Sequence, residues 1–289
     1  MATATEGKTA EKVTGRAVND VIAEARLPVP QTVVAERLMT KLPEISTIVH
    51  GIDPGLFLGA CISEANLLRL TMTDDELKSS HVIGSFVRSV FNAAVIGLVP
   101  GSVLGHCFFI PFKNRKVKGT PKMIQLVLGY RGLLHLGFST GYLVQCDPQV
   151  VLTGEFVELC HTESGPKMKH DIPALNRPLP DRTNIEAAYC TYRTRGGGMS
   201  LVFVGRDEIA KVDTNQNVWR DNYHAMCLKT PIRRASKVWQ LTRQLAAAVR
   251  LDEQADAGLL QDSFGPGRDE VEEPLDYATL VDTEGEAAE

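Results

Sequence analysis

The spacing of apolar residues along this chain changes at Pro100-Gly101. Before that point, residues 31–100 place apolar side chains three and four positions apart, which is the period of a helix, and the pattern is clearest over residues 80–98. After it, two runs rich in strand-forming residues follow, 104–112 and 122–128, with a basic loop between them. The chain therefore predicts an α+β fold with a helical N-terminal part and antiparallel hairpins packed with helices.

More strand-like runs follow, and the last two form a second hairpin around a turn of three glycines at 196–198. The expected bounds of these runs are Tyr142–Leu152, Phe156–His161, Ile185–Arg195 and Met199–Val204. Residues 162–184 are rich in proline and predict a loop. The final helix is expected over Pro231–Val249, because proline fits the first turn of a helix, where its missing N–H is harmless.

The charges of the chain are segregated, although the formal net charge is only -4. Residues 1–251 hold 30 basic and 22 acidic residues, whereas residues 252–289 hold 13 acids and Arg268 as the one base. A basic body indicates a polyanion as partner, and a polar acidic end predicts disorder. We therefore expect a flexible N-terminal segment (1–30), a polyanion-binding domain (31–251) and a disordered acidic tail (252–289).

The chain lacks the residues that several functions require. The chain has no apolar run of the roughly 18 residues that a membrane span needs and no apolar signal core, so we expect a cytoplasmic protein without a membrane partner. No GxxxxGKS/T run is present, so no ATP is expected, and the six cysteines form no CxxC pair that would indicate a metal site. We expect no catalytic residue. A metal-dependent nuclease is an alternative based on Asp181 and Glu186, although Ala188 occupies the position where that pattern has lysine.

Basic residues with aromatic neighbours are the remaining signal, and they predict contacts with phosphates and bases. One group lies at the tip of the first hairpin, a second at a strand-to-helix turn between two glycines, and a third on the last helix. Single arginines and one tryptophan complete the set. The candidates for DNA binding are Lys113, Arg115, Lys116, Lys118, Lys122, Tyr130, Arg131, Arg193, Arg195, Arg206, Trp219, Lys229, Arg233, Arg234 and Lys237.

Each group also has a plain structural explanation. The hairpin tip is otherwise a solvated loop, the tyrosine of the turn a packing residue beside an ion-paired arginine, and Trp219 a buried aromatic. Lys229, Arg233 and Lys237 recur every four residues, and few acids stand near them in that helix. This favours a stripe that follows phosphates over a self-neutralised surface.

Several motifs stand in a fixed order along the domain. They read GLVPG at 97–101, GHCFFIPFKN at 105–114 and QLVLGYRGL at 125–133, followed by Trp219, Met226, Lys229-Thr230 and Ile232-Arg233-Arg234. In this order the chain resembles the RecT family of phage and prophage single-strand annealing proteins, over about residues 45–251. Pro231 departs from the pattern, because the family usually has a helix former there.

The resemblance implies a function, an assembly and partners. It implies a curved sheet packed with helices, binding of single-stranded DNA, and annealing of complementary strands without ATP in phage-type homologous recombination. It implies a homo-oligomer in the form of a ring or a helical filament. The implied partners are single-stranded and nascent duplex DNA, a cognate 5′-to-3′ exonuclease and the host single-strand binding protein, with magnesium assisting annealing and no other cofactor. A protein that protects single strands without annealing them is the alternative.

Overall fold

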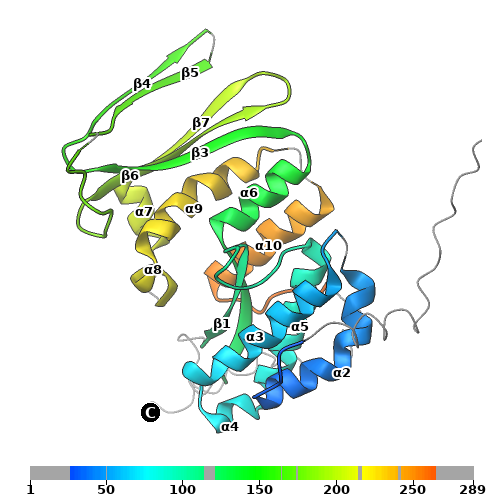
Figure 1. The fold of residues 1–289 in the computed structure, drawn as a ribbon. Coiled ribbons are helices and arrows are strands. Elements are labelled where there is room, and N and C mark those ends of the chain that lie inside the picture. Colours follow the sequence, from blue (N-terminus) through cyan, green and yellow to red (C-terminus); the bar gives the residue numbers. More distant parts are fainter. Residues whose placement is uncertain are drawn as a thin grey trace, which may run out of the picture.

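The computed structural model describes residues 27–49, 51–113, 121–163, 165–173, 175–213, 217–239 and 242–264. Its N-terminal part is helical, as predicted, and consists of α2 (Val33–Ile48), α3 (Pro54–Leu67), the 3₁₀ turn η1 (Leu68–Leu70), α4 (Asp74–Leu77) and α5 (Ser80–Ile96) (Figure 1). Local chemistry sets the ends of these helices. Thr32 begins α2 because its hydroxyl accepts a hydrogen bond from the Ala35 N–H at 3.1 Å. Gly97 ends α5 with a φ of 76°, a left-handed conformation that suits glycine.

The first predicted hairpin packs against these helices. Strands β1 (Cys107–Phe112) and β2 (Met123–Leu128) pair antiparallel, with Cys107 opposite Leu128. The hairpin lies on α5, where the rings of Phe86 and Phe109 meet edge to face with centroids 5.0 Å apart. Residues 114–120, the tip of the hairpin, are outside the described residues. The core of this half therefore combines helical and strand side chains.

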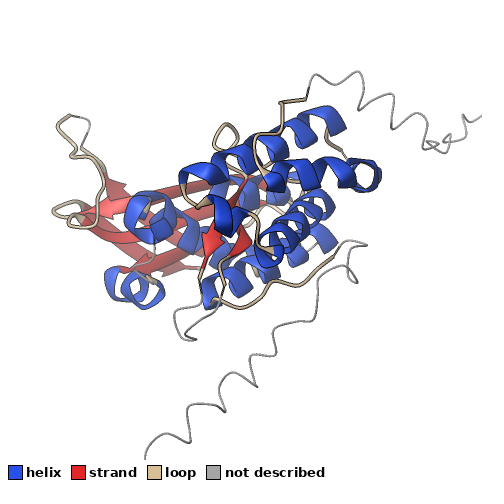
Figure 2. Ribbon diagram, turned by 90° about the horizontal axis from the view of Figure 1, so that it is seen from below, coloured by secondary structure: helices blue, strands red, loops and turns tan. Residues whose placement is uncertain are grey.

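The second half is a sheet in the order β3–β6–β7, built from β3 (Leu143–Leu152), β6 (Ile185–Thr194) and β7 (Met199–Gly205). One face carries α7 (Arg206–Val212), α8 (Asn217–Asp221) and α9 (Tyr223–Ser236). The other face carries the hairpin of β4 (Phe156–Thr162) and β5 (Gly165–Asp171), whose Val157 and Met168 pack on Tyr189. Seen from below, the strands of this half lie at one end of the molecule and the N-terminal helices at the other (Figure 2).

The α+β prediction and the two predicted hairpins are confirmed, with two differences in the strands. Among the described residues the antiparallel strands are divided between three sheets. The predicted loop over 162–184 contains β5. This strand was missed because polar side chains alternate along it, so that Met168 and His170 are its main inward residues and no apolar run marks it.

The C-terminal helices differ more from the prediction. Pro231 lies inside α9, and a separate helix, α10 (Arg243–Ala257), follows. The folded part also extends past the predicted boundary at Asp252, since residues 258–264 run along the free edge of β2. There the Gln261 side chain bonds both backbone groups of Leu126, the N–H at 2.8 Å and the carbonyl at 2.7 Å. The predicted acidic tail is thus partly folded, and its residues 265–289 lie outside the described residues, as do residues 1–26.

Candidate nucleic-acid interface

The turn between β2 and α6 (Tyr130–Ser139) is shaped by close backbone packing. A Cβ on Gly129 would lie 2.1 Å from the carbonyl oxygen of Gly105, and one on Gly132 would lie 2.2 Å from that of His106. The Gly129 N–H also donates to the His106 carbonyl at 2.9 Å. The close approach that these glycines permit is therefore that of the chain's own backbone. Its effect is to fix Tyr130, which is half-buried, and Arg131, which is exposed.

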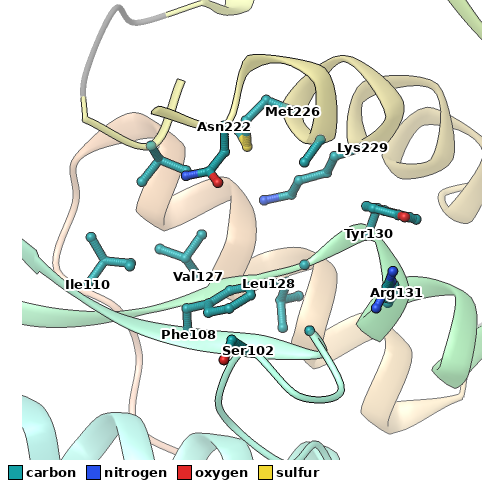
Figure 3. A pocket seen from close by; sticks show the side chains of 14 residues that line it. Ser102, Phe108, Ile110, Val127, Leu128, Tyr130, Arg131, Asn222, Met226 and Lys229 are labelled. Carbon is teal, nitrogen blue, oxygen red and sulfur yellow. The ribbon is translucent and has the colours of Figure 1, made fainter. Parts of the chain in front are cut away.

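Beside this turn lies a cavity of about 380 Å³ between the β1–β2 hairpin and α8–α9 (Figure 3). Apolar side chains of β1, β2 and α9 form much of its wall, and polar groups enter from the turn and from α9. The lining residues are Ser102, Gly105, Phe108, Ile110, Val127, Leu128, Gly129, Tyr130, Arg131, Val218, Asn222, Ala225, Met226 and Lys229. Asn222 and Lys229 extend from the α9 side toward the apolar residues of the strands.

Arg131 is the cation that the turn places at this cavity. Arg131 forms no ion pair within the part of the chain that the structure describes, and its Cζ lies 5.9 Å from the centroid of the Tyr130 ring. Next to it, the rings of His106 and His135 stack with centroids 4.6 Å apart. Burial, together with His135 and Arg131, lowers the pKa of His106 below its ordinary value. Arg131 is therefore the exposed permanent cation of the turn.

The predicted stripe on α9 pairs with acidic side chains of another helix. Lys229 and Arg233 bond Asp252 of α10, at 2.5 Å and 3.5 Å. Arg233 also pairs with Asp256, and Lys237 pairs with Glu253. We call these six residues the α9–α10 ladder. The sequence prediction of an unneutralised stripe is wrong, because the carboxylates come from α10, a helix that was partly assigned to the disordered tail.

The other predicted residues are spread over the molecule. Some are exposed and form no ion pair with any described residue, and these are Lys113, Arg193 and Arg195. Others pair with an acid, namely Lys122 with Glu76 at 2.8 Å, Arg206 with Glu186 at 2.9 Å and Arg234 with Glu208 at 2.9 Å. Arg115, Lys116 and Lys118 lie outside the described residues. Of the predicted set, Tyr130, Arg131 and Lys229 are brought together at the cavity.

Trp219 belongs to the core. Its side chain is 3% exposed and packs with Tyr223, the two ring centroids being 5.9 Å apart. The guanidinium of Arg182 covers the Tyr223 ring at 4.4 Å. Burial raises the pKa of Tyr223 to about 12. Of the two explanations given for Trp219, the buried aromatic is the one that the structure shows.

The residues considered for nuclease chemistry have other partners. The Asp181 carboxylate accepts hydrogen bonds from the backbone and hydroxyl of Thr183, both at 2.7 Å, which makes it a turn residue. Glu186 pairs with Arg206 and accepts from the Thr153 hydroxyl. Within the described ranges, no three His, Cys, Asp or Glu side chains gather as metal ligands would. None of the helices in those ranges combines the length and the apolarity needed to cross a bilayer.

Several residues of the cavity were missed by reasoning from the sequence. Phe108 and Ile110 are two positions apart on β1 and so share a face, which the alternation along the strand could have indicated. Asn222 and Met226 stand on adjacent turns at the start of α9 and carried no charge signal. Asp252 was counted only as one acid of the tail. Its burial depends on how α10 packs against α9, which no local pattern reveals.

Comparisons with known proteins identify relatives of this chain. The family model described as "RecT family" matches residues 69–265, a range that contains the cavity and the α9–α10 ladder. Protein RecT of Escherichia coli (strain K12) is 31% identical over 176 residues, which cover 58% of this chain and 62% of that protein. The chain therefore spans somewhat less than two thirds of the length of this curated relative.

Proposed function

Because the chain belongs to the RecT family, we propose that it binds single-stranded DNA and anneals complementary strands without ATP, as an oligomer assembled on the DNA. The proposal includes a homologous-recombination role of the phage type in the cytoplasm of a bacterial host. It also includes partnership with an exonuclease that exposes the strand and with the host single-strand binding protein. Magnesium would assist by screening the two strands.

The cavity at the turn of Tyr130 and Arg131 is the observation that carries this proposal. Its walls offer apolar and aromatic surface, on which bases and sugars can pack. The exposed Arg131 offers positive charge beside that surface, and the Lys229 ammonium, which is paired with Asp252, offers N–H donors. A groove that joins cations to aromatic and apolar surface is the arrangement that suits a single strand, because the strand exposes both phosphates and base faces.

In the proposed mechanism the protein only positions the DNA strands. Exposed cations such as Arg131, Arg193 and Arg195 hold phosphates, and contacts to phosphate carry no sequence information. Complementarity between the two DNA strands then decides which pairing succeeds. Neutralising phosphates lowers the repulsion between the strands, and holding one strand extended reduces the entropy lost on pairing. No covalent step is involved.

An annealing assay without nucleotide tests the proposal. Labelled complementary oligonucleotides are mixed with the full chain, with and without magnesium, and both duplex formation and strand length are followed. We expect duplex to form faster with protein than without it, and strand length to stay constant. Binding without faster pairing would indicate a protector of single strands, and shortened strands would indicate a nuclease; either result contradicts the proposal.

A further inference from the structure

Lys229 is a buried cation whose charged end faces the cavity. Its side chain is 3% exposed, and it extends from α9 toward the strands (Figure 3). Within the described residues its ammonium has one partner, the Oδ1 of Asp252, at 2.5 Å. An ammonium carries three N–H donors. Donors of Lys229 therefore remain for a group that enters the cavity.

Asp252 is the counter-charge of this lysine. It is 0% exposed and lies on α10, and its second oxygen is 3.5 Å from Nη1 of Arg233. Burial lowers the pKa of Lys229, whereas the Asp252 carboxylate raises it and Arg233 lowers it further. Without Asp252, a buried ammonium beside a guanidinium would have no compensating charge and would tend to lose its proton.

The apolar surroundings of Lys229 strengthen a hydrogen bond that its ammonium donates. The cavity wall next to it is apolar, with Phe108, Ile110 and Val127 from the strands. A charge-assisted hydrogen bond is stronger where water is partly excluded, since the effective dielectric is lower there. The other charged or titratable side chains nearby are Arg131 and Tyr130 of the turn.

We propose that Asp252 is a positioning residue that holds the Lys229 ammonium in the cavity, where it binds one phosphodiester of the DNA strand. The proposal rests on the proposed function. Asp252 stays in place when the phosphate arrives, because the phosphate accepts a hydrogen bond from a donor that Asp252 does not use. The carboxylate therefore supports binding of an anion, although its own charge is negative.

The variant Asp252→Asn tests this in the full chain. Binding of a fluorescent oligothymidylate is measured by anisotropy at fixed salt, from about pH 6 to about pH 9, because burial lowers the pKa of a lysine below its ordinary value. We expect affinity to fall about ten-fold at neutral pH, the size of one charge-assisted hydrogen bond. We also expect binding to be lost at a lower pH than in the unchanged protein, because Lys229 without its counter-charge gives up its proton earlier as pH rises.

Two further variants make the test decisive. Glu253→Gln removes an exposed acid of the next ladder position and should leave both affinity and pH profile unchanged within about two-fold. If Asp252→Asn does not fold, as circular dichroism would show, the double variant Lys229→Met/Asp252→Leu replaces the pair with apolar side chains, a change that folds commonly tolerate. That variant should also lose about ten-fold in affinity, the size of one charge-assisted hydrogen bond.

The contrary outcomes are distinct. A folded Asp252→Asn variant with an unchanged pH profile, or a double variant with unchanged affinity, would overturn the inference. Tighter binding by Asp252→Asn would show instead that the carboxylate competes with DNA. Failure of the unchanged protein to bind the oligonucleotide would refute the proposed function itself.

Discussion

The turn at Tyr130-Arg131 and the stripe on α9 carry similar residues but have different surroundings. The turn stands at a surface, and Arg131 has no acidic partner among the described residues. The stripe faces α10, where Asp252, Asp256 and Glu253 pair with its cations. Charge spacing along a helix shows which side chains share a face, whereas the packing of another element decides whether that face is open to a ligand.

The largest expected effect comes from the glycines that build the turn. Gly132→Ala places a Cβ 2.2 Å from a backbone oxygen, so the loop must move, and we expect a loss of about 3 kcal/mol in unfolding free energy. Urea unfolding measures this loss. Gly196→Ala is the control, because a Cβ added there would have no heavy atom within 4 Å, and its stability should change by less than about 0.5 kcal/mol. Equal stability of the two variants would show that the turn is not held by this contact.

Much of the fold is predictable where a local pattern coincides with burial. The two hairpins have strand-forming runs and turn residues, and the helix ending at Gly97 has regular apolar spacing. The division of the C-terminal part into α9 and α10 is different, because Pro231 suggests a helix start where α9 in fact continues. The candidate site likewise has a part that the sequence marks and a part that it does not. Tyr130 and Arg131 are marked by flanking glycines, but the partner of Lys229 lies on a separate helix.

The next effect compares the turn with Arg234, a cation of α9 that lies outside the α9–α10 ladder. Arg131→Ala should weaken binding of single-stranded DNA about ten-fold and lower the slope of log affinity against log salt by about 0.7, since one phosphate contact is lost. Arg234→Ala should weaken binding less, because Glu208 already pairs with that guanidinium at 2.9 Å. Fluorescence anisotropy over a salt series measures both. A larger loss of affinity in Arg234→Ala than in Arg131→Ala would contradict the proposal that DNA binds at the turn.

A smaller effect is expected at the exposed end of the ladder. Lys237 and Glu253 are each about half exposed, so Lys237→Ala should lower the unfolding free energy by less than about 1 kcal/mol. It should also change DNA affinity little. Thermal unfolding and anisotropy measure the two quantities. A fall in affinity as large as that of Arg131→Ala would show that the ladder opens to receive DNA.

The smallest effect concerns the base of the hairpin. The hydrogen bond from Lys122 is the main reason that the pKa of Glu76 lies below its ordinary value of 4.5. A carboxylate with a lowered pKa stabilises the folded state above its unfolded-state pKa, and this stabilisation disappears as pH falls through the folded-state value. Glu76→Gln should therefore lower the Tm slightly at neutral pH and not at all in strong acid. A Tm difference that persists in acid would contradict the pairing.

Photocrosslinking tests most directly whether DNA enters at the turn. The full chain is bound to single-stranded oligonucleotides that carry 4-thiothymidine, irradiated and digested, and the crosslinked peptides are identified by mass spectrometry. We expect crosslinks in the peptides that contain Phe108, Tyr130 and Met226, the residues of the cavity wall. Crosslinks confined to peptides of the β4–β5 hairpin or of the outer face of α10, with none at the cavity, would contradict the assignment.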